Sequence, residues 1–142
     1  MLYDNVFINA DGDAIHIQPH NDVPRDMAIF SNTVLASGMG IRVRSAAEAP
    51  YRQRVMANVV SAAVPLQGGE AAYNISLAYR PDLLNVAVSE LTSRLLVKRP
   101  QMRRLPQSLV RELAAYPGWQ EASYPGARVS PALLHTLDAS WP

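Results

Sequence analysis

The stretch YNISLAYRPDLLNVAVSELTSRLLVK, residues 73–98, carries the clearest secondary-structure pattern in the chain. From Tyr73 to Tyr79, apolar residues alternate with small or polar ones, which is typical of a half-buried strand. Pro81 then occupies a favoured first position of a helix, and apolar residues follow at helical spacing as far as Lys98. The stretch therefore predicts a strand over residues 73–79 and a helix over residues 81–98.

The residues before this stretch predict a similar mixture of strands and helices. Residues 2–18 indicate a hairpin, with turn-forming residues between two β-rich runs. Apolar residues at helical spacing predict helices over about residues 24–35 and 51–64. Between these helices, the alternating residues 41–44 predict a short strand.

The residues after it predict short helices, the first over residues 107–116. The expected order is thus β-β-α-β-α-β-α, and we find no internal repeat or linker in the sequence. We expect an α+β fold, or a mixed α/β one, in which a small sheet of about four strands packs with three or more helices. A single domain covers residues 1–142, and its Pro/Gly/aromatic-rich segment 117–142 packs on it or extends from it.

The composition indicates a soluble, cytoplasmic protein. Hydrophobic residues make up 49% of the 142 residues, which is enough for a core in one domain. The absence of cysteine excludes disulfides, thiolate metal sites and cysteine nucleophiles. The N-terminus has no signal-peptide pattern, and no window is apolar enough to span a bilayer. We therefore expect no membrane partner.

No motif predicts catalysis or cofactor binding. The glycines at 38–40 and 68–69 lack the spacing of a phosphate-binding loop, and the sequence contains no nucleophile elbow. His16 and His20, with Asp22 close behind, leave open a small enzyme with a His/Asp site. A proline between the two histidines prevents a helix from presenting both, and a metal centre needs three or four converging ligands. We expect no metal and no cofactor.

Basic residues cluster in one segment, although the net charge is only +1. The cluster contains no acidic residue and consists of Arg94, Lys98, Arg99, Arg103 and Arg104. Such a cluster at the end of a helix can contact several phosphates, so an accessory RNA- or DNA-binding protein is the alternative function. The acidic segment 1–26 offers another explanation, because the two segments can neutralise each other in the fold.

The apolar surface of the predicted 81–98 helix is wider than one sheet face covers. Aromatic residues, which dominate interface hot spots, recur in the C-terminal segment. We therefore expect a non-catalytic interaction or assembly subunit, self-associating as an accessory component of a larger complex, with a two-fold homodimer as the default. The residues predicted to contact partners are Leu83, Val86, Leu91, Trp119 and Trp141.

Overall fold

The computed structural model describes residues 1–18, 26–44, 50–87, 90–91, 94–95, 105–119 and 126. Within these residues, nine strands form two sheets, and every strand pair is parallel. Sheet A contains, in this order, β1 (Leu2–Tyr3), β4 (Met27–Phe30), β6 (Gln53–Met56) and β8 (Glu70–Ala72). Sheet B contains β2 (Val6–Asn9), β5 (Thr33–Val43), β7 (Val59–Gln67) and β9 (Ile75–Leu77), with β3 (Ile15–Ile17) also paired to β5.

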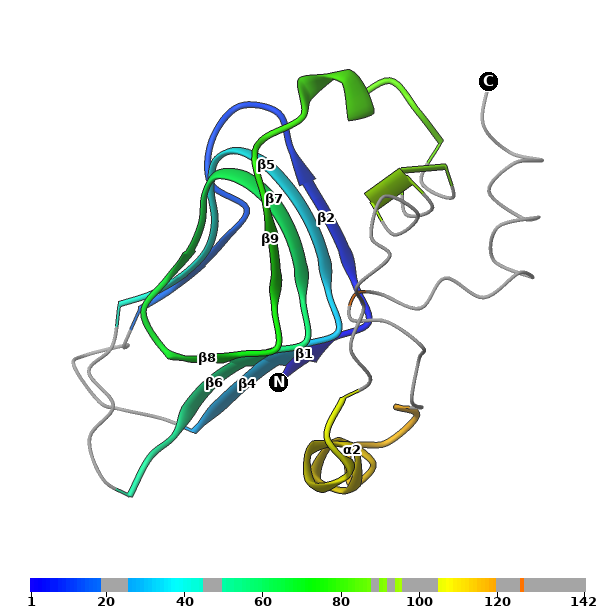
Figure 1. Cartoon of the computed structure of the whole chain (residues 1–142). Helices are drawn as coiled ribbons and strands as arrows, with labels where there is room; N and C mark the ends of the chain where they lie inside the picture. The colour runs from blue at the N-terminus through cyan, green and yellow to red at the C-terminus, as the bar shows by residue number, and fades with distance from the viewer. Residues whose placement is uncertain are drawn as a thin grey trace.

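The chain winds through these sheets in successive coils. β1 leads to β2 and β3, β4 leads to β5, β6 leads to β7, and β8 leads to β9. The register of β5 against β7 shifts between Ala36 and Met39, where both strands bend. Beyond the bend they form, with β3, a third face that gives the coils a triangular cross-section (Figure 1). The fold is therefore a short parallel β-helix, a solenoid in which each coil packs on its neighbours.

Columns of side chains fill the space inside the coils. Equivalent positions of successive strands form two such columns: Leu2, Ile29, Val55 and Ala71 in sheet A, and Phe7, Val34, Val60 and Ser76 in sheet B. The second and third members of each column are at most 1% exposed. Burial of one such side chain contributes about 1.5–3 kcal/mol, so the columns hold the coils together.

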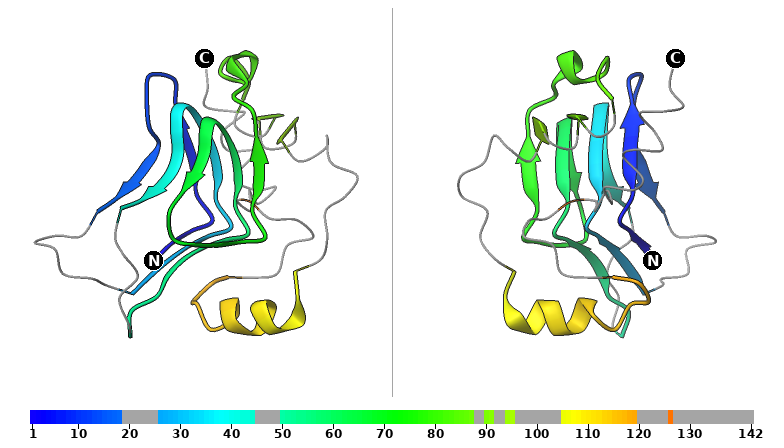
Figure 2. Two further views of the ribbon diagram at one scale, coloured as in Figure 1. Left: turned by 60° about the vertical axis from the view of Figure 1, so that its left-hand side comes forward. Right: turned by 90° about the vertical axis from the view of Figure 1, so that its right-hand side faces the viewer.

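The outer faces of both sheets are covered as well. The helix α2 (Gln107–Leu113) lies across the outer face of sheet A (Figure 2). The large buried side chains of this contact are Phe30, Met56, Leu109, Leu113 and Trp119. On sheet B, the 3₁₀ turn η1 (Pro81–Leu83) and the residues after it contribute Leu83, Leu91 and Leu95. The central strands are thus buried on two sides.

The expected α+β fold, with a sheet of about four strands and three or more helices, is wrong. The protein has two parallel sheets, and the longest helix among the described residues is α2, with seven residues. The helices predicted at 24–35 and 51–64 are the strand pairs β4–β5 and β6–β7. Strands that are buried on both faces carry continuous apolar runs, and such runs fit a helical spacing as well as a strand.

The hairpin predicted over residues 2–18 is also wrong. β2 and β3 both pair with β5 and not with each other. A turn does lie between them, with Gly12 at a φ of 132°. This turn is a corner of the coil. The strands on its two sides, β2 and β3, therefore pair with β5 of the next coil.

Four predicted strands and one helix are confirmed. The two β-rich runs within residues 2–18 are β2 and β3. β9 lies within the strand predicted at 73–79, the strand predicted at 41–44 is the end of β5, and α2 lies within the helix predicted at 107–116. The segment predicted as a helix at 81–98 starts instead with η1, and its later described residues 90–91 and 94–95 are helical. No helix of the described residues is long and apolar enough to cross a membrane.

Candidate functional site

Sheet A meets sheet B at a corner that recurs in all four coils. At each corner, a non-glycine residue has a positive φ of 53–57°: Asp4, Ser31, Ala57 and Tyr73. This left-handed conformation costs about 1–2 kcal/mol for most residues, so each corner needs a compensating interaction. The next residue provides it, because in every coil that residue is an asparagine.

The four asparagines, Asn5, Asn32, Asn58 and Asn74, form one hydrogen-bonded ladder. The Oδ1 atoms of Asn32, Asn58 and Asn74 each accept the backbone N–H of the asparagine one coil earlier, over 3.1, 2.9 and 3.0 Å respectively. Their Nδ2 atoms donate to the carbonyl oxygens of Leu2, Ile29 and Val55 in the same direction. Asn32 and Asn58 are fully buried, so the ladder satisfies polar groups that no water reaches and fixes the register of the coils.

The two ends of the ladder carry complementary groups. No described residue donates to the Oδ1 of Asn5 from an earlier coil or accepts the N–H of Asn74 in a later one. The N–H of Thr33 donates to the Asn5 carbonyl (2.9 Å), so the alternation of a parallel strand directs the Val6 N–H away from β5, to the edge of β2 with which no described strand pairs. The Asn74 carbonyl is the equivalent acceptor at the last coil. The first coil therefore offers the Asn5 Oδ1 as an acceptor and the Val6 N–H as a donor. The last coil offers the complementary groups, the N–H and the carbonyl of Asn74.

The interior columns end in side chains of different size. In the first coil the columns end in Leu2 and Phe7, which are only partly buried. In the last coil they end in Ala71 and Ser76, which are exposed. A bulky end and a small end of the same column can pack on each other without overfilling the core.

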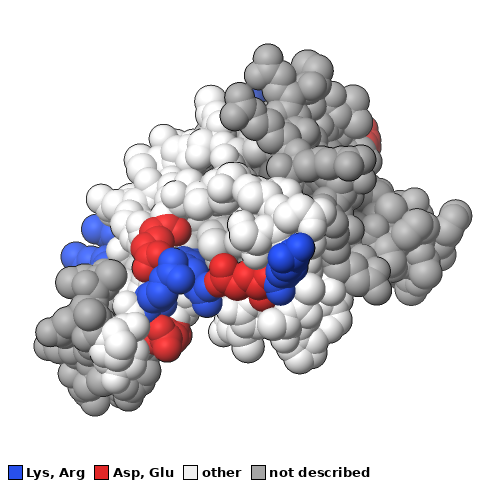
Figure 3. Space-filling model, turned by 60° about the horizontal axis from the view of Figure 1, so that its bottom comes forward, with Lys and Arg blue, Asp and Glu red and all other residues white. Residues whose placement is uncertain are grey.

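Ion pairs occupy the outer face of sheet A beside α2, where acidic and basic side chains alternate (Figure 3). Arg52 binds Glu70 with 2.7 Å between Nη2 and Oε2. This hydrogen bond lowers the pKa of the Glu70 carboxyl below its ordinary value and raises the pKa of Arg52. Arg54 pairs with Glu112 of α2 and donates to the Tyr116 hydroxyl over 3.2 Å, which ties the helix to the sheet.

A cleft of about 470 Å³ opens among these side chains, with Met1, Asp26, Arg52, Arg54 and Tyr116 in its lining. Its charged groups already have partners within the chain: Asp26 accepts the backbone N–H of Arg52 over 2.8 Å, and both arginines are in ion pairs. The described residues include no group of three histidine, aspartate or glutamate side chains that could hold a metal ion. Among the described residues, the two arginines of the cleft are thus already paired within the chain.

The predicted nucleic-acid cluster is described only at its first member. Arg94 is exposed and pairs with Glu90, one helical turn earlier. The rest of the cluster, Lys98, Arg99, Arg103 and Arg104, lies outside the described residues. Of the possible His/Asp site, His16 is exposed on β3, whereas His20 and Asp22 lie outside the described residues. Both functions stay predictions.

The residues predicted to contact a partner mostly pack against the chain's own sheets. Leu83 and Leu91 are buried on sheet B, and Val86 is partly buried beside them. Trp119 is buried on sheet A, where its indole N–H donates to the Ser31 hydroxyl over 3.0 Å. Trp141 lies outside the described residues. Their role towards a partner stays a prediction.

The sequence analysis missed the ladder asparagines. The expectation of no repeat is wrong, because each coil contains an apolar residue three positions before an asparagine: Leu2–Asn5, Ile29–Asn32, Val55–Asn58 and Ala71–Asn74. These asparagines are separated by 27, 26 and 16 residues, and the unequal spacing conceals the repeat. An alignment of the chain with itself that allows gaps at the corners would have found it.

No protein-family model matches the chain, and no curated protein or solved structure matches it either. Its function must therefore be inferred from the residues themselves.

Proposed function

We propose that this protein is a non-catalytic assembly subunit that associates with further copies of itself, the last coil of one copy against the first coil of the next. The open ladder supports this function. In the contact, the N–H of Asn74 donates to the Oδ1 of Asn5 in the next copy, and the N–H of Val6 donates to the Asn74 carbonyl. Both bonds repeat those that already join coils within the chain.

The interior columns support the same contact. Stacked in register, Leu2 of one copy lies over Ala71 of another, and Phe7 lies over Ser76. The contact buries the partly exposed side chains of Leu2 and Phe7. This burial stabilises the stack by about 25 cal/mol for each Å² of apolar surface removed from water. In the part of the chain that the structure describes, no further strand pairs with β1 and β2 at one end or with β8 and β9 at the other, so these strands supply the main-chain groups that parallel pairing uses.

This contact joins unlike ends, so it favours a head-to-tail stack over the two-fold homodimer. A two-fold contact between first coils would not reproduce the bonds that join coils within the chain, because both surfaces would carry the same groups. A head-to-tail contact does not close on itself and adds copies in one direction.

The test is the mass of the protein in solution, measured by light scattering across a concentration series. Ala71→Lys places a charge at the exposed end of a column, where Leu2 of the next copy would pack. Gln107→Lys adds the same charge on the exposed surface of α2 and is the matched control. We expect the parent and Gln107→Lys to grow in mass with concentration, while Ala71→Lys stays monomeric. A monomeric parent, or growth that Ala71→Lys leaves unchanged, would overturn the proposal.

A further inference from the structure

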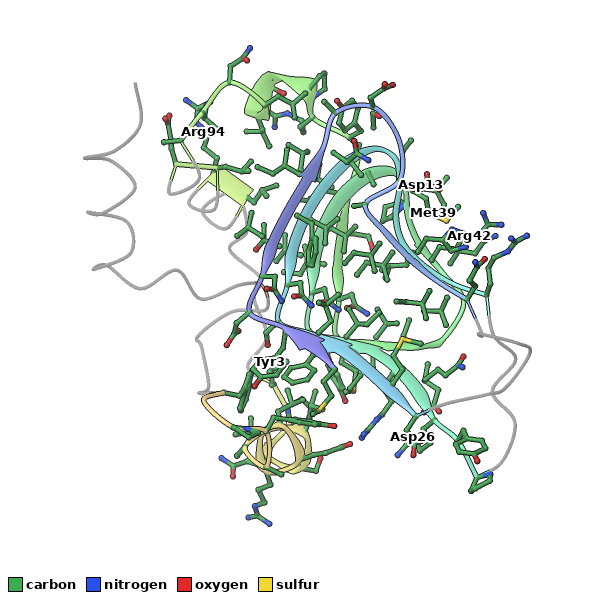
Figure 4. The ribbon with its side chains drawn as sticks, turned by 180° about the vertical axis from the view of Figure 1, so that it is seen from behind. Tyr3, Asp13, Asp26, Met39, Arg42 and Arg94 are labelled. Atoms are coloured by element: carbon green, nitrogen blue, oxygen red, sulfur yellow. The ribbon has the colours of Figure 1, made fainter. Side chains whose placement is uncertain are left out.

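The third face of the coil presents a basic surface that the described residues leave uncovered. Ile15, Ile41 and Leu66 are in register across β3, β5 and β7 and face the interior. The next residue of each strand therefore points outward: His16, Arg42 and Gln67. Figure 4 shows Arg42 pointing away from the coil. We call the set of His16, Arg42, Arg44 and Gln67 the basic strip.

The two arginines of the basic strip take part in none of the ion pairs that the described residues form. Those pairs are Arg52–Glu70, Arg54–Glu112, Arg80–Asp82 and Arg94–Glu90. The described carboxylate at the end of this face is Asp13, whose Oδ1 accepts the backbone N–H of Met39 over 2.7 Å. Among the described residues, no carboxylate pairs with Arg42 or Arg44, so their charge can bind an anion.

The backbone holds the two arginines in a fixed relation. Arg44 continues the ladder beyond β5, because its N–H donates to the Ile17 carbonyl over 2.8 Å. The Nε atom of Arg42 is buried without a hydrogen-bond partner, so the arm of this side chain lies against the sheet. Arg42 and Arg44 lie two residues apart on the same face of the strand. Their positions are therefore about 6.6 Å apart.

We propose that the basic strip binds an extended acidic peptide that lies along β5. Acidic residues at alternate positions of an extended chain repeat at the same distance of about 6.6 Å, so two carboxylates can face Arg42 and Arg44 together. Arginine binds carboxylates through two parallel hydrogen bonds, and His16 and Gln67 add donors on the flanking strands. The strip carries no phenylalanine, tyrosine or tryptophan side chain on which nucleic-acid bases could stack, so a peptide fits it better than a single strand of nucleic acid.

The experiment measures the fluorescence anisotropy of two labelled peptides of equal composition, one with glutamate and threonine in alternation and one with the glutamates grouped. We expect the alternating peptide to bind more tightly. Its affinity is expected to fall about tenfold for each arginine removed in Arg42→Gln/Arg44→Gln, because each substitution removes a charge-assisted pair of hydrogen bonds. Arg111→Gln on α2 removes an exposed arginine elsewhere and is expected to leave binding unchanged.

Two further variants keep the result unambiguous. Arg44→Gln alone changes an exposed residue, so it reports on binding even if the double variant unfolds. Ala71→Lys is expected to bind the peptide like the parent, since the strip does not depend on coil stacking. Equal binding of the two peptides, equal displacement by single-stranded DNA of the same charge, or no binding at low salt would each overturn the proposal.

Discussion

Asn58 holds Asn32 through a single oxygen atom: its Oδ1 accepts the backbone N–H of Asn32 at 2.9 Å and the side-chain Nδ2 of Asn32 at 3.0 Å. Both residues are fully buried, so no water can replace either bond. The relationship repeats from coil to coil and makes the ladder the element that sets the register of the whole fold.

Asn58→Ala is expected to destabilise the protein strongly. It removes the acceptor of both Asn32 bonds and the donor to the carbonyl of Ile29, which leaves several buried polar groups unpaired. We expect a loss of about 3–5 kcal/mol in the free energy of unfolding, measured by urea denaturation. Asn85→Ala, at an exposed position, is the matched control and is expected to change stability by less than about 0.5 kcal/mol. Equal effects of the two substitutions would show that the ladder does not hold the coils.

Gly40→Ala is expected to destabilise the core, because Gly40 lies where β5 bends inward. A Cβ there would be 2.2 Å from Cγ1 of Val60 and 2.6 Å from the Pro65 carbonyl oxygen. We expect a cost of about 1–3 kcal/mol or more, again measured by urea denaturation. The same substitution in a Val60→Ala background is expected to cost less, since one of the two close neighbours is gone. A cost that is independent of Val60 would contradict the packing described here.

Leu113→Ala is expected to loosen α2 from sheet A. Leu113 is fully buried between the helix and the outer face of the sheet, and its truncation leaves a cavity. The expected cost is about 2–5 kcal/mol in the free energy of unfolding, whereas Ser108→Ala on the exposed side of the same helix is expected to be nearly neutral. A neutral Leu113→Ala would mean that α2 contributes nothing to the stability of the coils.

The ion pair of Arg52 and Glu70 predicts a small dependence of stability on acid pH. The folded-state pKa of Glu70 is lowered, chiefly by the hydrogen bond from Arg52. Its contribution is therefore complete above the ordinary glutamate pKa of about 4.3 and is lost as the pH falls through the lower folded value. The urea concentration at the midpoint of unfolding is expected to be lower at about pH 3 than at about pH 6. This difference is expected to be larger in the parent protein than in Glu70→Gln. Identical pH dependence in the two proteins would rule out the contribution.

The sequence predicts a strand correctly where burial differs between its two faces. In β9, at the end of sheet B, Ile75 and Leu77 pack outward against the covering segment, while Ser76 lies at the exposed end of the core. The resulting alternation is visible in the sequence. In β4, by contrast, three of the four residues MAIF are buried and Met27 is partly buried, so apolar residues follow without a break and resemble one side of a helix.

The asparagine repeat is difficult to recognise in the sequence because one corner of the coil varies in length. Between β7 and β8 this corner consists of Gly68 and Gly69, with φ values of 75° and 73°. A Cβ on Gly68 would lie 2.1 Å from the Val43 carbonyl oxygen, so this tight turn requires glycine. The equivalent corners after β3 and β5 are longer, which makes the coils unequal in sequence although they are equivalent in space.

The most direct test of coil stacking is a disulfide between copies. The chain contains no cysteine, and Asp4 and Tyr73 occupy the same corner position of the first and last coils. In a stack they are neighbours about 4.8 Å apart, within the range of about 4.4–6.8 Å between Cα atoms that a disulfide spans. We expect mild oxidation of Asp4→Cys/Tyr73→Cys to give a series of disulfide-linked multimers on a non-reducing denaturing gel, while each single variant gives no such series. A double variant without disulfide-linked multimers, or an Asp4→Cys variant that forms a disulfide-linked dimer by itself, would contradict head-to-tail assembly.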